Sequence, residues 1–300
     1  MASLPPDPDT EAARLDPGGP RALDSPRPAR DTAAMKIATF NVNGIKARAG
    51  AVADWLDESA PDVALLQELK SVDEGVPREI FEDRGYNLET HGQKGFNGVA
   101  IASRLPLEDV VRGLPDPAGA GRDGADDDEA RWIEATVVGD VAVRLCCLYL
   151  PNGNPAPGPK YDYKLRWMAR LEARARALLA GEEVAVMAGD YNVIPQDEDA
   201  ARPEKMAQDA LMLPETRAAF RRVLNLGMSD AFRLRTAGPG HYSYWDYFGG
   251  AFDHNHGLRI DHHLLTPQAA DLLRGAWIET DPRAKAKPSD HTPVWIELAA

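Results

Sequence analysis

The sequence has little cysteine and no long apolar run. Its two cysteines, Cys146 and Cys147, are adjacent within an expected strand, where neighbouring side chains point to opposite faces. No structural disulfide is therefore expected between them, and a reducing, cytoplasmic setting is predicted. No stretch approaches the roughly 20 apolar residues of a membrane span, and no charged head followed by an apolar segment opens the chain. These absences predict a soluble protein without a secretion signal.

An excess of positive charge is also lacking. The formal net charge is −13, which counts against binding polyanions by bulk attraction. The charge is unevenly spread, because residues 116–129 hold six acids and one base whereas residues 160–176 are rich in Lys and Arg. A substrate phosphate could therefore still meet a local basic surface or a metal ion.

The chain divides into a tail and one expected domain. Residues 1–34 are rich in Pro, Ala, Asp and Arg without apolar periodicity, and we expect them to be disordered. Residues 35–300 are expected to form a single domain. Within it, the acidic stretch 115–130 is expected to be a surface insertion.

Strands and helices are expected to alternate along this domain. Helices are expected around the apolar stripes of residues 52–56 and 165–179 and within 203–227, where Gly227 ends the last one. Strands are expected over residues 36–42, 62–67, 97–103, 131–138, 141–149, 184–189, 258–265 and 292–298. A hairpin signal at Gly139-Asp140, mixed with strand–helix alternation, favours an α/β fold of packed sheets with helices outside.

Polar residues stand at the ends of these apolar strands. The apolar runs within segments such as KIATFNVNG, DVALLQELK and VAVMAGDYNV end in, or are interrupted by, Asn, Glu or Asp. A buried strand has no packing reason to end on a carboxylate, so several strands that do so indicate one shared rim. Carboxylates and carboxamides gathered at a rim are typical of a hard-cation site that handles phosphate.

Six of these segments carry a family resemblance. FNVNG, LLQELK, YLPNG, GDYN, RID and SDH occur in this order and resemble the signature segments of the exonuclease III family of Mg-dependent DNA repair nucleases, within the endonuclease/exonuclease/phosphatase superfamily. The segments HGQKGFNGVAIAS and YSYWDYFGGAFDHNHGLRID resemble the DNA-repair members more than the phosphoinositide phosphatases or sphingomyelinases. The resemblance implies a DNase-I-like, four-layer fold, in which two packed mixed β-sheets are flanked by helices.

The resemblance also implies roles for the polar residues of the rim. Glu68 would be the primary metal ligand, Asp190 the base or water-orienting carboxylate, and Asp261 the partner of a charged His291. The implied metal-binding residues are Asn41, Glu68, Asp190, Asn192, Asp290 and His291. The implied catalytic residues are Tyr149, Asp190, Asn192, Asp261 and His291.

Ordinary structural roles compete with each of these assignments. Asn43 before Gly44 and the Asp-x-Asn of GDYN are also typical of turns, and Tyr149 could be a core tyrosine with a solvated tip. His262 and His263 have no motif partner and are expected to be structural. The roles of His241, His254 and His256 are left open.

Substrate contacts are implied around a pocket for a flipped-out abasic sugar. Such a pocket would accept a base-free sugar and exclude a normal nucleotide by bulk. The implied substrate-binding residues are Asn43, Lys70, Lys94, Asn97, Tyr244, Trp245 and Leu258. Trp245 has a competing role as a core aromatic residue. Further cations that could contact DNA phosphates are Lys46, Arg48, Lys160 and Lys164, although the Arg-rich part of residues 160–180 is expected to face solvent.

Together these observations predict a monomeric, metal-dependent DNA repair nuclease. We expect it to use Mg²⁺, with Mn²⁺ as an alternative, and to act on duplex DNA at abasic sites and 3′ ends. The alternative is a phosphatase or phosphodiesterase of the same superfamily that acts on lipid or small-molecule phosphates. One departure from the family pattern is Leu69, which stands where Thr is usual, so altered hydrogen bonding around the metal site is expected.

Overall fold

The computed structural model describes residues 34–115 and 129–299. The predicted disordered tail therefore lies outside the described residues, except for Ala34, which already belongs to the first strand. Most of the predicted acidic insertion also lies outside them. Among the described residues, no helix is both long and apolar enough to cross a membrane.

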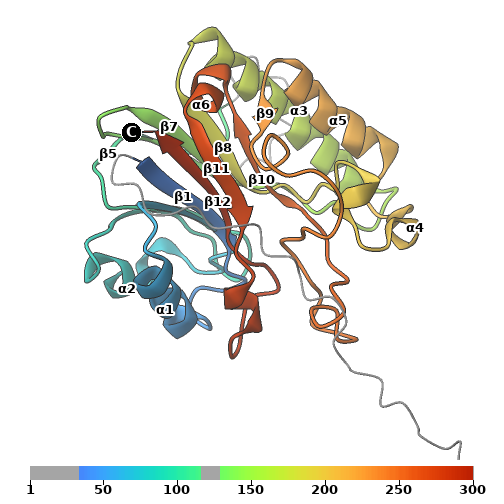
Figure 1. The fold of residues 1–300 in the computed structure, drawn as a ribbon, viewed down its shortest axis with the longest axis horizontal. Helices are drawn as coiled ribbons and strands as arrows, with labels where there is room; N and C mark the ends of the chain where they lie inside the picture. The colour runs from blue at the N-terminus through green and yellow to red at the C-terminus, as the bar shows by residue number, and fades with distance from the viewer. Residues whose placement is uncertain (1–33, 116–128, 300) are drawn as a thin grey trace, which may run out of the picture.

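Two six-stranded sheets pack face to face, with helices on both outer surfaces (Figure 1). The first sheet has the spatial order β11 (Leu273–Ile278), β12 (Val294–Ala299), β1 (Ala34–Asn41), β2 (Val63–Gln67), β4 (Val99–Ser103) and β3 (Asn87–His91). The second has the order β5 (Leu107–Arg112), β6 (Trp132–Val137), β7 (Val143–Tyr149), β8 (Ala185–Asp190), β10 (Asp261–Leu265) and β9 (Ser229–Asp230). Only β1–β2 and β7–β8 are parallel pairs among these strands. Both sheets are therefore mixed, as predicted.

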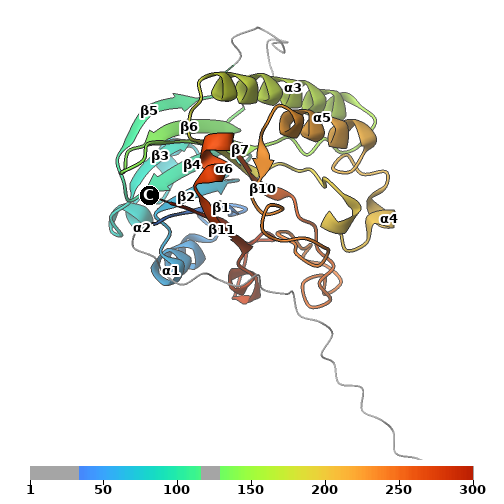
Figure 2. The ribbon, with the colours of Figure 1, turned by 45° about the horizontal axis from the view of Figure 1, so that its top comes forward.

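Helices complete the four layers. The outer face of the first sheet packs against α1 (Ala49–Ser59) and α2 (Glu79–Glu82). The outer face of the second sheet packs against α3 (Pro159–Ala180) and α5 (Pro214–Asn225), which run side by side (Figure 2). Short helices occupy the connections: α4 (Pro203–Met206), α6 (Pro267–Asp271) and the 3₁₀ turns Asp73–Gly75, Asp197–Asp199 and Asp281–Ala284. The predicted four-layer α/β sandwich is confirmed.

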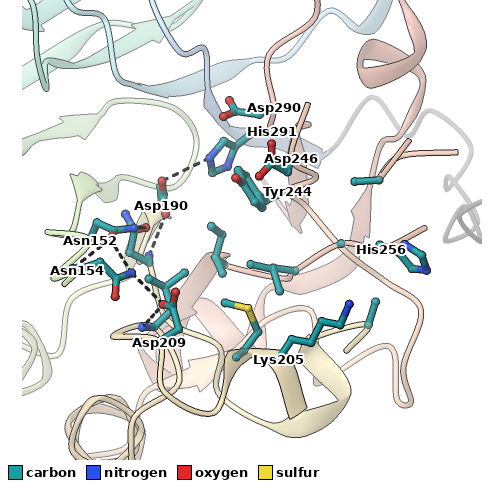
Figure 3. A pocket seen from close by; sticks show the side chains of 18 of the residues that line it. Asn152, Asn154, Asp190, Lys205, Asp209, Tyr244, Asp246, His256, Asp290 and His291 are labelled. Atoms are coloured by element: carbon teal, nitrogen blue, oxygen red, sulfur yellow. Dashed lines mark hydrogen bonds and ion pairs between the residues drawn. The ribbon is translucent and has the colours of Figure 1, made fainter. Parts of the chain in front are cut away.

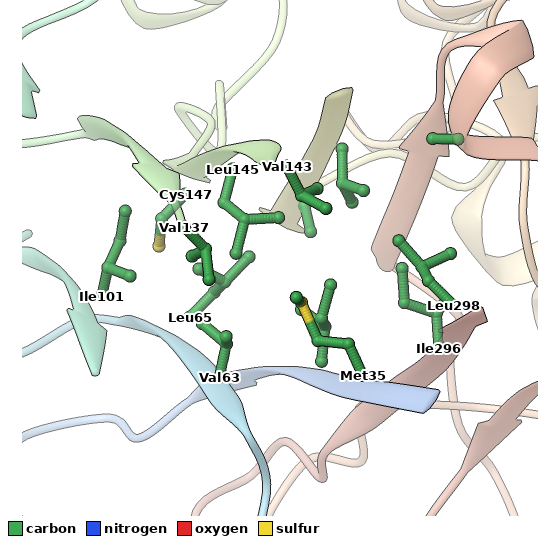
Figure 4. Close-up of a cluster of buried hydrophobic side chains, with 14 of the residues drawn as sticks. Met35, Val63, Leu65, Ile101, Val137, Val143, Leu145, Cys147, Ile296 and Leu298 are labelled. Atoms are coloured by element: carbon green, nitrogen blue, oxygen red, sulfur yellow. The ribbon is translucent and has the colours of Figure 1, made fainter. Parts of the chain in front are cut away.

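The main core lies between the two sheets. Alternate residues of the central strands meet there, including Leu65, Ile101, Leu145 and Ile296 (Figure 4). Cys147 faces this core, whereas Cys146 faces the layer formed with α3 and α5, so the two thiols point to opposite faces and remain free. The expectation that they form no disulfide is confirmed.

Four strands were missing from the sequence-based expectation: β3, β5, β9 and β11. They are the edge strands of the two sheets. An edge strand need not be apolar on both faces, and β5 has no buried residue while β3 is buried only at alternate positions. The expected strand over 258–265 was also too long, because only Asp261–Leu265 pairs as β10. Continuous apolar runs mark the central strands, because only these strands are buried on both faces.

The two parallel pairs bring the polar strand ends together. Parallel strands end at the same edge of a sheet, and each pair is crossed over by one helix, α1 or α3. Asn41 at the end of β1 is level with Gln67 of β2, and Tyr149 of β7 is level with Asp190 of β8. Asp190 is level with Asp261 of β10. Both sheets therefore present their functional side chains at one rim.

Candidate active site

A pair of carboxylates from different sheets forms the centre of the rim. The Asn41 Nδ2 donates to Glu68 Oε1 at 2.9 Å and to Asp190 Oδ2 at 3.0 Å, so one amide joins the two acids. Its Oδ1 accepts the backbone N–H of Asn43 at 3.0 Å, which fixes the orientation of the amide. Glu68 and Asn43 both have left-handed backbone conformations, with φ of 55° and 46°. The chain is thus turned sharply where each strand ends.

The backbone before Asp190 requires glycine. Gly189 has φ 155°, and a Cβ at this position would lie 1.9 Å from the carbonyl oxygen of Leu148 on the neighbouring strand. Strands β7 and β8 therefore approach closely at their last residues. This close contact explains why glycine precedes Asp190 in the GDYN segment.

His291 lies beside Asp190 and is contacted by two carboxylates, those of Asp190 and Asp261. His291 Nδ1 is 2.9 Å from Asp261 Oδ2, and His291 Nε2 is 3.7 Å from Asp190 Oδ2. The Ser243 hydroxyl donates to Asp261 Oδ2 at 2.6 Å and so fixes that carboxylate. Burial by itself would lower the pKa of His291, but Asp261 and Asp190 outweigh it and raise the pKa to about 10. The imidazole is therefore a cation that donates hydrogen bonds.

The two central acids differ in their electrostatics. Burial raises the pKa of Asp190, an effect that Asp261 and Glu68 reinforce and the charge of His291 opposes. Burial would also raise the pKa of Glu68, but hydrogen bonds from Asn41 and Lys70 outweigh it and lower that pKa. Glu68 is thus a stable anion, whereas Asp190 has a greater affinity for protons.

Tyr149 completes the rim next to these acids. Burial, together with the charges of Glu68 and Asp190, raises the pKa of the Tyr149 phenol well above its ordinary value. The Arg131 guanidinium lies 5.0 Å from the centre of the Tyr149 ring and holds it in place. The phenol therefore keeps its proton and can donate it in a hydrogen bond.

The donor set suits a hard divalent cation. One ligand atom each from Glu68, Asp190 and His291 lies within 4.8 Å of the others. Because His291 is charged, the carboxylates are the oxygen ligands that Mg²⁺ prefers. Lys70 Nζ lies 2.7 Å from Glu68 Oε2, so a positive charge is already stabilised at this position. Asp290 is nearby, since Asn43 donates to it at 2.9 Å and also accepts from Lys70 at 2.5 Å.

Two carboxamides line the site beside Asp190. Asn192 donates its backbone N–H to Asp190 Oδ1 at 2.9 Å, and its side-chain amide donates to the carbonyl of Leu150 at 3.0 Å. Its Oδ1 accepts from Asn152 Nδ2 at 2.9 Å. The side chains of Asn192 and Asn41 are thus engaged in positioning their neighbours. The metal ligation that the resemblance implies for both residues stays a prediction.

A cavity of about 700 Å³ opens from this centre. Its lining includes Tyr244, Leu258 and Ile260, which form an apolar wall, and Tyr244 packs edge-on against His291 at 5.0 Å. Figure 3 shows His291 and Tyr244 beside each other, facing Asp190. Lys205 and His256 lie at the end away from Asp190 (Figure 3), and Arg202 donates to His256 there at 2.7 Å. Carboxylates, an apolar wall and cations in one cavity suit a phosphodiester attached to a sugar.

Comparison with known proteins agrees with this chemistry. The profile described as the Endonuclease/Exonuclease/phosphatase family matches residues 38–291. This chain belongs to that family. Exodeoxyribonuclease III of Haemophilus influenzae is 33% identical over 277 residues, which cover 88% of this chain and 100% of the relative.

Two solved structures extend the comparison. An AP endonuclease from Archaeoglobus fulgidus superposes with a TM-score of 0.81 at 35% identity, covering 89% of this chain and 100% of that one. The 3′ phosphatase NExo from Neisseria, bound to a product DNA hairpin, gives a TM-score of 0.80 at 37% identity, covering 88% and 99%. The family member described here is a hydrolase of the exodeoxyribonuclease III and AP endonuclease type, a DNA repair nuclease.

The nuclease site brings together most of the residues predicted from sequence. The described contacts and cavity unite Asn41, Asn43, Glu68, Lys70, Tyr149, Asp190, Asn192, Tyr244, Leu258, Asp261, Asp290 and His291. Their individual roles remain predictions. Lys94 lies exposed on the loop between β3 and β4, outside this set of contacts.

Two predicted substrate-binding residues of the nuclease are placed elsewhere. Trp245 is fully buried and donates to Asn255 Oδ1 at 3.1 Å, so its competing role as a core aromatic is the correct one. Asn97 is also buried, and its amide donates to Gln93 at 2.9 Å. Trp245 thus belongs to the core of its loop, whereas Asn97 is as exposed as Asn192 and His291, so the substrate contact implied for it stays a prediction.

Several further expectations also need correction. Leu69 packs into the apolar cluster with α1, and the altered hydrogen bonding expected around the metal site stays a prediction. Lys164 is fully buried and cannot reach a DNA phosphate. The Arg-rich face of α3 is not wholly solvated, since Arg174 binds the buried Glu134 at 2.9 Å and Arg170 is itself buried. Lys160 is exposed, as a phosphate-binding residue requires.

Sequence reasoning missed some residues of the nuclease site. Asn152 stands in the quoted YLPNG segment, three residues after Tyr149, and that proximity could have identified it. Ile260 stands in RID and could have been paired with Leu258, two residues away on the same side of an extended chain. Arg202 and Lys205 have no local signal, because only the placement of α4 brings them to the cavity.

Proposed function

We propose that this nuclease uses Mg²⁺, or alternatively Mn²⁺, to hydrolyse the phosphodiester on the 5′ side of an abasic site in duplex DNA. We propose further that it removes nucleotides and blocking groups from 3′ ends. The observation that supports this most is the shared cavity, in which the acids of the rim adjoin the apolar wall of Tyr244, Leu258 and Ile260. A base-free sugar can pack against such a wall, whereas a normal nucleotide would need additional room for its base.

Asp190 is suited to orient and deprotonate the attacking water. It is buried, it is fixed by Asn41 and by the backbone of Asn192, and its raised pKa makes it a better base than an exposed aspartate. The oriented carboxylate can place water in line with the phosphorus atom, which removes much of the entropic cost of the attack.

Charge that develops on the phosphate is met by donors that are already in place. His291 offers an N–H from Nε2, since Nδ1 is held by Asp261, and Tyr149 offers its phenolic proton. Each such donor contributes on the order of 2–4 kcal/mol to the transition state. A metal ion held by Glu68, with Asp190 and Asp290 nearby, would add a Lewis acid at the same oxygens.

The cations of the cavity would hold the flanking DNA. Arg202 and Lys205 line the cavity, and Lys94, exposed on the loop between β3 and β4, could contact a further phosphate. Local cations of this kind would compensate for the net negative charge of the chain.

Purified protein should be assayed on duplexes carrying one abasic site, a nick or a 3′-phosphate, with Mg²⁺, with EDTA, and beside inositol phosphates. We expect Mg²⁺-dependent cleavage 5′ to the abasic site. The matched control is Asp271→Asn, an exposed acid on α6, beside Asp190→Asn. Activity on inositol phosphates without DNA cleavage would instead support the small-molecule phosphatase.

A further inference from the structure

One buried lysine lies directly beneath the catalytic loops. Lys164 is on α3, about one turn from the start of the helix, and its side chain is fully buried. Its Nζ donates to the backbone carbonyl of Asn192 at 2.6 Å and to that of Asn152 at 3.1 Å. Lys164 therefore connects α3 to the two loops that follow β7 and β8.

These two loops carry the carboxamides beside Asp190. The Asn152 side chain donates to Asn192 at 2.9 Å, and the Asn192 backbone N–H donates to Asp190 at 2.9 Å. Asn192 also has a left-handed backbone, with φ 48°, a conformation that asparagine adopts more readily than most residues. Lys164 therefore constrains the position from which Asp190 receives its hydrogen bond.

The loop after β7 is shaped around the lysine. Gly153, with φ 91°, stands next to Asn152, and a Cβ there would lie 2.7 Å from Lys164 Cδ and 3.1 Å from Ala210 Cβ. The aliphatic part of the lysine thus occupies the space that a larger residue at 153 would need. Because the loop has glycine at 153 and so leaves room for the aliphatic part of Lys164, position 164 fits a long, unbranched side chain.

Burying an amine in that space costs more free energy than burying an apolar side chain of the same size. A methionine would fill a similar volume without the desolvation cost of an amine, so packing alone does not account for lysine here. What methionine lacks is the pair of hydrogen bonds to the two carbonyls. The chemistry that distinguishes lysine at this position is therefore the fixing of Asn152 and Asn192.

We propose that Lys164 is a positioning residue for phosphodiester hydrolysis, which holds the loops of Asn152 and Asn192 so that Asp190 and both carboxamides keep one geometry at the scissile phosphate. The proposal rests on the proposed function, because the geometry matters for catalysis only if a phosphodiester is cut there. Lys164 itself contacts no substrate. Its effect is transmitted through the two carbonyls that it binds.

The first test replaces Lys164 with methionine and compares it with Arg176→Met, an exposed cation on the same helix. Since small misplacements of catalytic groups are costly, kcat for abasic-site cleavage should fall by about 10²-fold in Lys164→Met. KM should change by no more than about twofold, because the cations that hold the DNA are untouched. Arg176→Met should retain the kcat of the wild type.

The second test is a double-mutant cycle with Asn152→Ala. If Lys164 acts through the Asn152 loop, the loss of kcat in the double variant should be clearly smaller than the product of the two single losses. A purely structural lysine would lower the melting temperature, and the two losses of kcat would multiply. Melting temperatures are recorded so that all rates are measured on folded protein.

Three outcomes would overturn the proposal: an unchanged kcat in Lys164→Met, a loss expressed mainly in KM, or losses that multiply in the cycle. If Lys164→Met does not fold, Lys164→Gln replaces it, since glutamine is one atom shorter and cannot reach both carbonyls; wild-type kcat in that variant would count equally against the proposal. A wild-type protein that cuts no phosphodiester would refute the proposed function instead, so the two failures are distinguishable.

Discussion

Two buried charged clusters lie at either side of the start of strand β10, and they differ in charge balance. In the first, Arg259 binds Asp199 at 2.6 Å and Asp230 at 2.9 Å, and Arg233 also binds Asp199 at 2.5 Å. In the second, two residues further along the chain, Asp261 and its neighbour Asp190 share the cation His291, while Glu68 is paired with Lys70 at 2.7 Å.

The comparison separates charges that stabilise from charges that react. Burial would raise the pKa of Asp199 and of Asp230, but Arg259 outweighs it and lowers both pKa values, so these acids are fully compensated. Burial raises the pKa of Asp190, and its carboxylate neighbours add to that effect. The balanced cluster holds the loop that carries Leu258 and Ile260, whereas the unbalanced cluster has a deficit of positive charge that a metal ion can fill.

The largest expected effect is on activity in the unbalanced cluster. Asp190→Asn should reduce abasic-site cleavage on the order of 10³-fold, because the base is lost, and His291→Ala should act in the same direction. In Asp190→Asn the free energy of unfolding should stay equal or rise, because one of two carboxylates that share a cation becomes a neutral amide, whereas in His291→Ala it should fall, because both carboxylates lose that cation. Single-turnover cleavage and urea unfolding measure the two effects. Near-normal turnover in either variant would contradict the assigned role.

The corresponding change in the balanced cluster should affect stability. Arg259→Met leaves Asp199 and Asp230 buried without their cation, so the free energy of unfolding should fall by about 3–5 kcal/mol. Arg221→Met, an exposed arginine on α5, is the control and should change little. Urea unfolding of the two variants is the measurement. A loss of less than about 1 kcal/mol in Arg259→Met would mean that this cluster is not what holds the loop.

Metal binding should compensate the unbalanced cluster. At 100 times its dissociation constant, Mg²⁺ should add about 2.7 kcal/mol to the free energy of unfolding, and Glu68→Gln should lose most of this gain. EDTA should abolish cleavage. Unfolding curves recorded with and without Mg²⁺ test the effect independently of activity. Equal stabilisation of wild type and Glu68→Gln would place the metal elsewhere.

The smallest effect concerns a histidine that lacks any such partner. His263 is buried in β10, its ring nitrogens have no hydrogen-bond partner among the described residues, and burial lowers its pKa from 6.5 to about 3. A histidine with a depressed folded pKa binds its proton only in the unfolded chain between pH 6.5 and 3. Stability is therefore lost as the pH falls through this window.

His263→Leu should remove that loss. Between pH 7.5 and pH 5.5 the wild type should lose about 1 kcal/mol more than the variant. His254→Leu, an exposed histidine, should follow the wild type. Urea unfolding at the two pH values provides the measurement, and parallel pH dependence in all three proteins would contradict the assignment. At His291 the neighbouring carboxylates outweigh burial and raise the pKa, whereas at His263 burial prevails and lowers it.

Central strands and the motif residues at their ends could be predicted from sequence, whereas edge strands could not. Strands such as β2 and β8 are apolar on both faces, so their signal is local and strong. Strands β3, β5, β9 and β11 are defined by pairing with a neighbour that the local sequence does not reveal. The same limit applies to side chains: Lys164 and Lys160 are indistinguishable by type and spacing, yet one is buried and the other exposed.

The sequence by itself determined which chemistry is present, because the order of strand-ending Asn, Glu, Asp and His residues is a property of the chain alone. The packing of the two sheets decided which of these residues meet. Asn41 and Asp190 are 149 positions apart and become hydrogen-bonded only when the ends of β1 and β8 reach the same rim. Tertiary structure also decided that Trp245 is covered, that Lys164 lies beneath the loops and that Arg202 and Lys205 reach the cavity. Burial and charge compensation depend on neighbours that are distant in sequence, which is why only the folded chain fixes them.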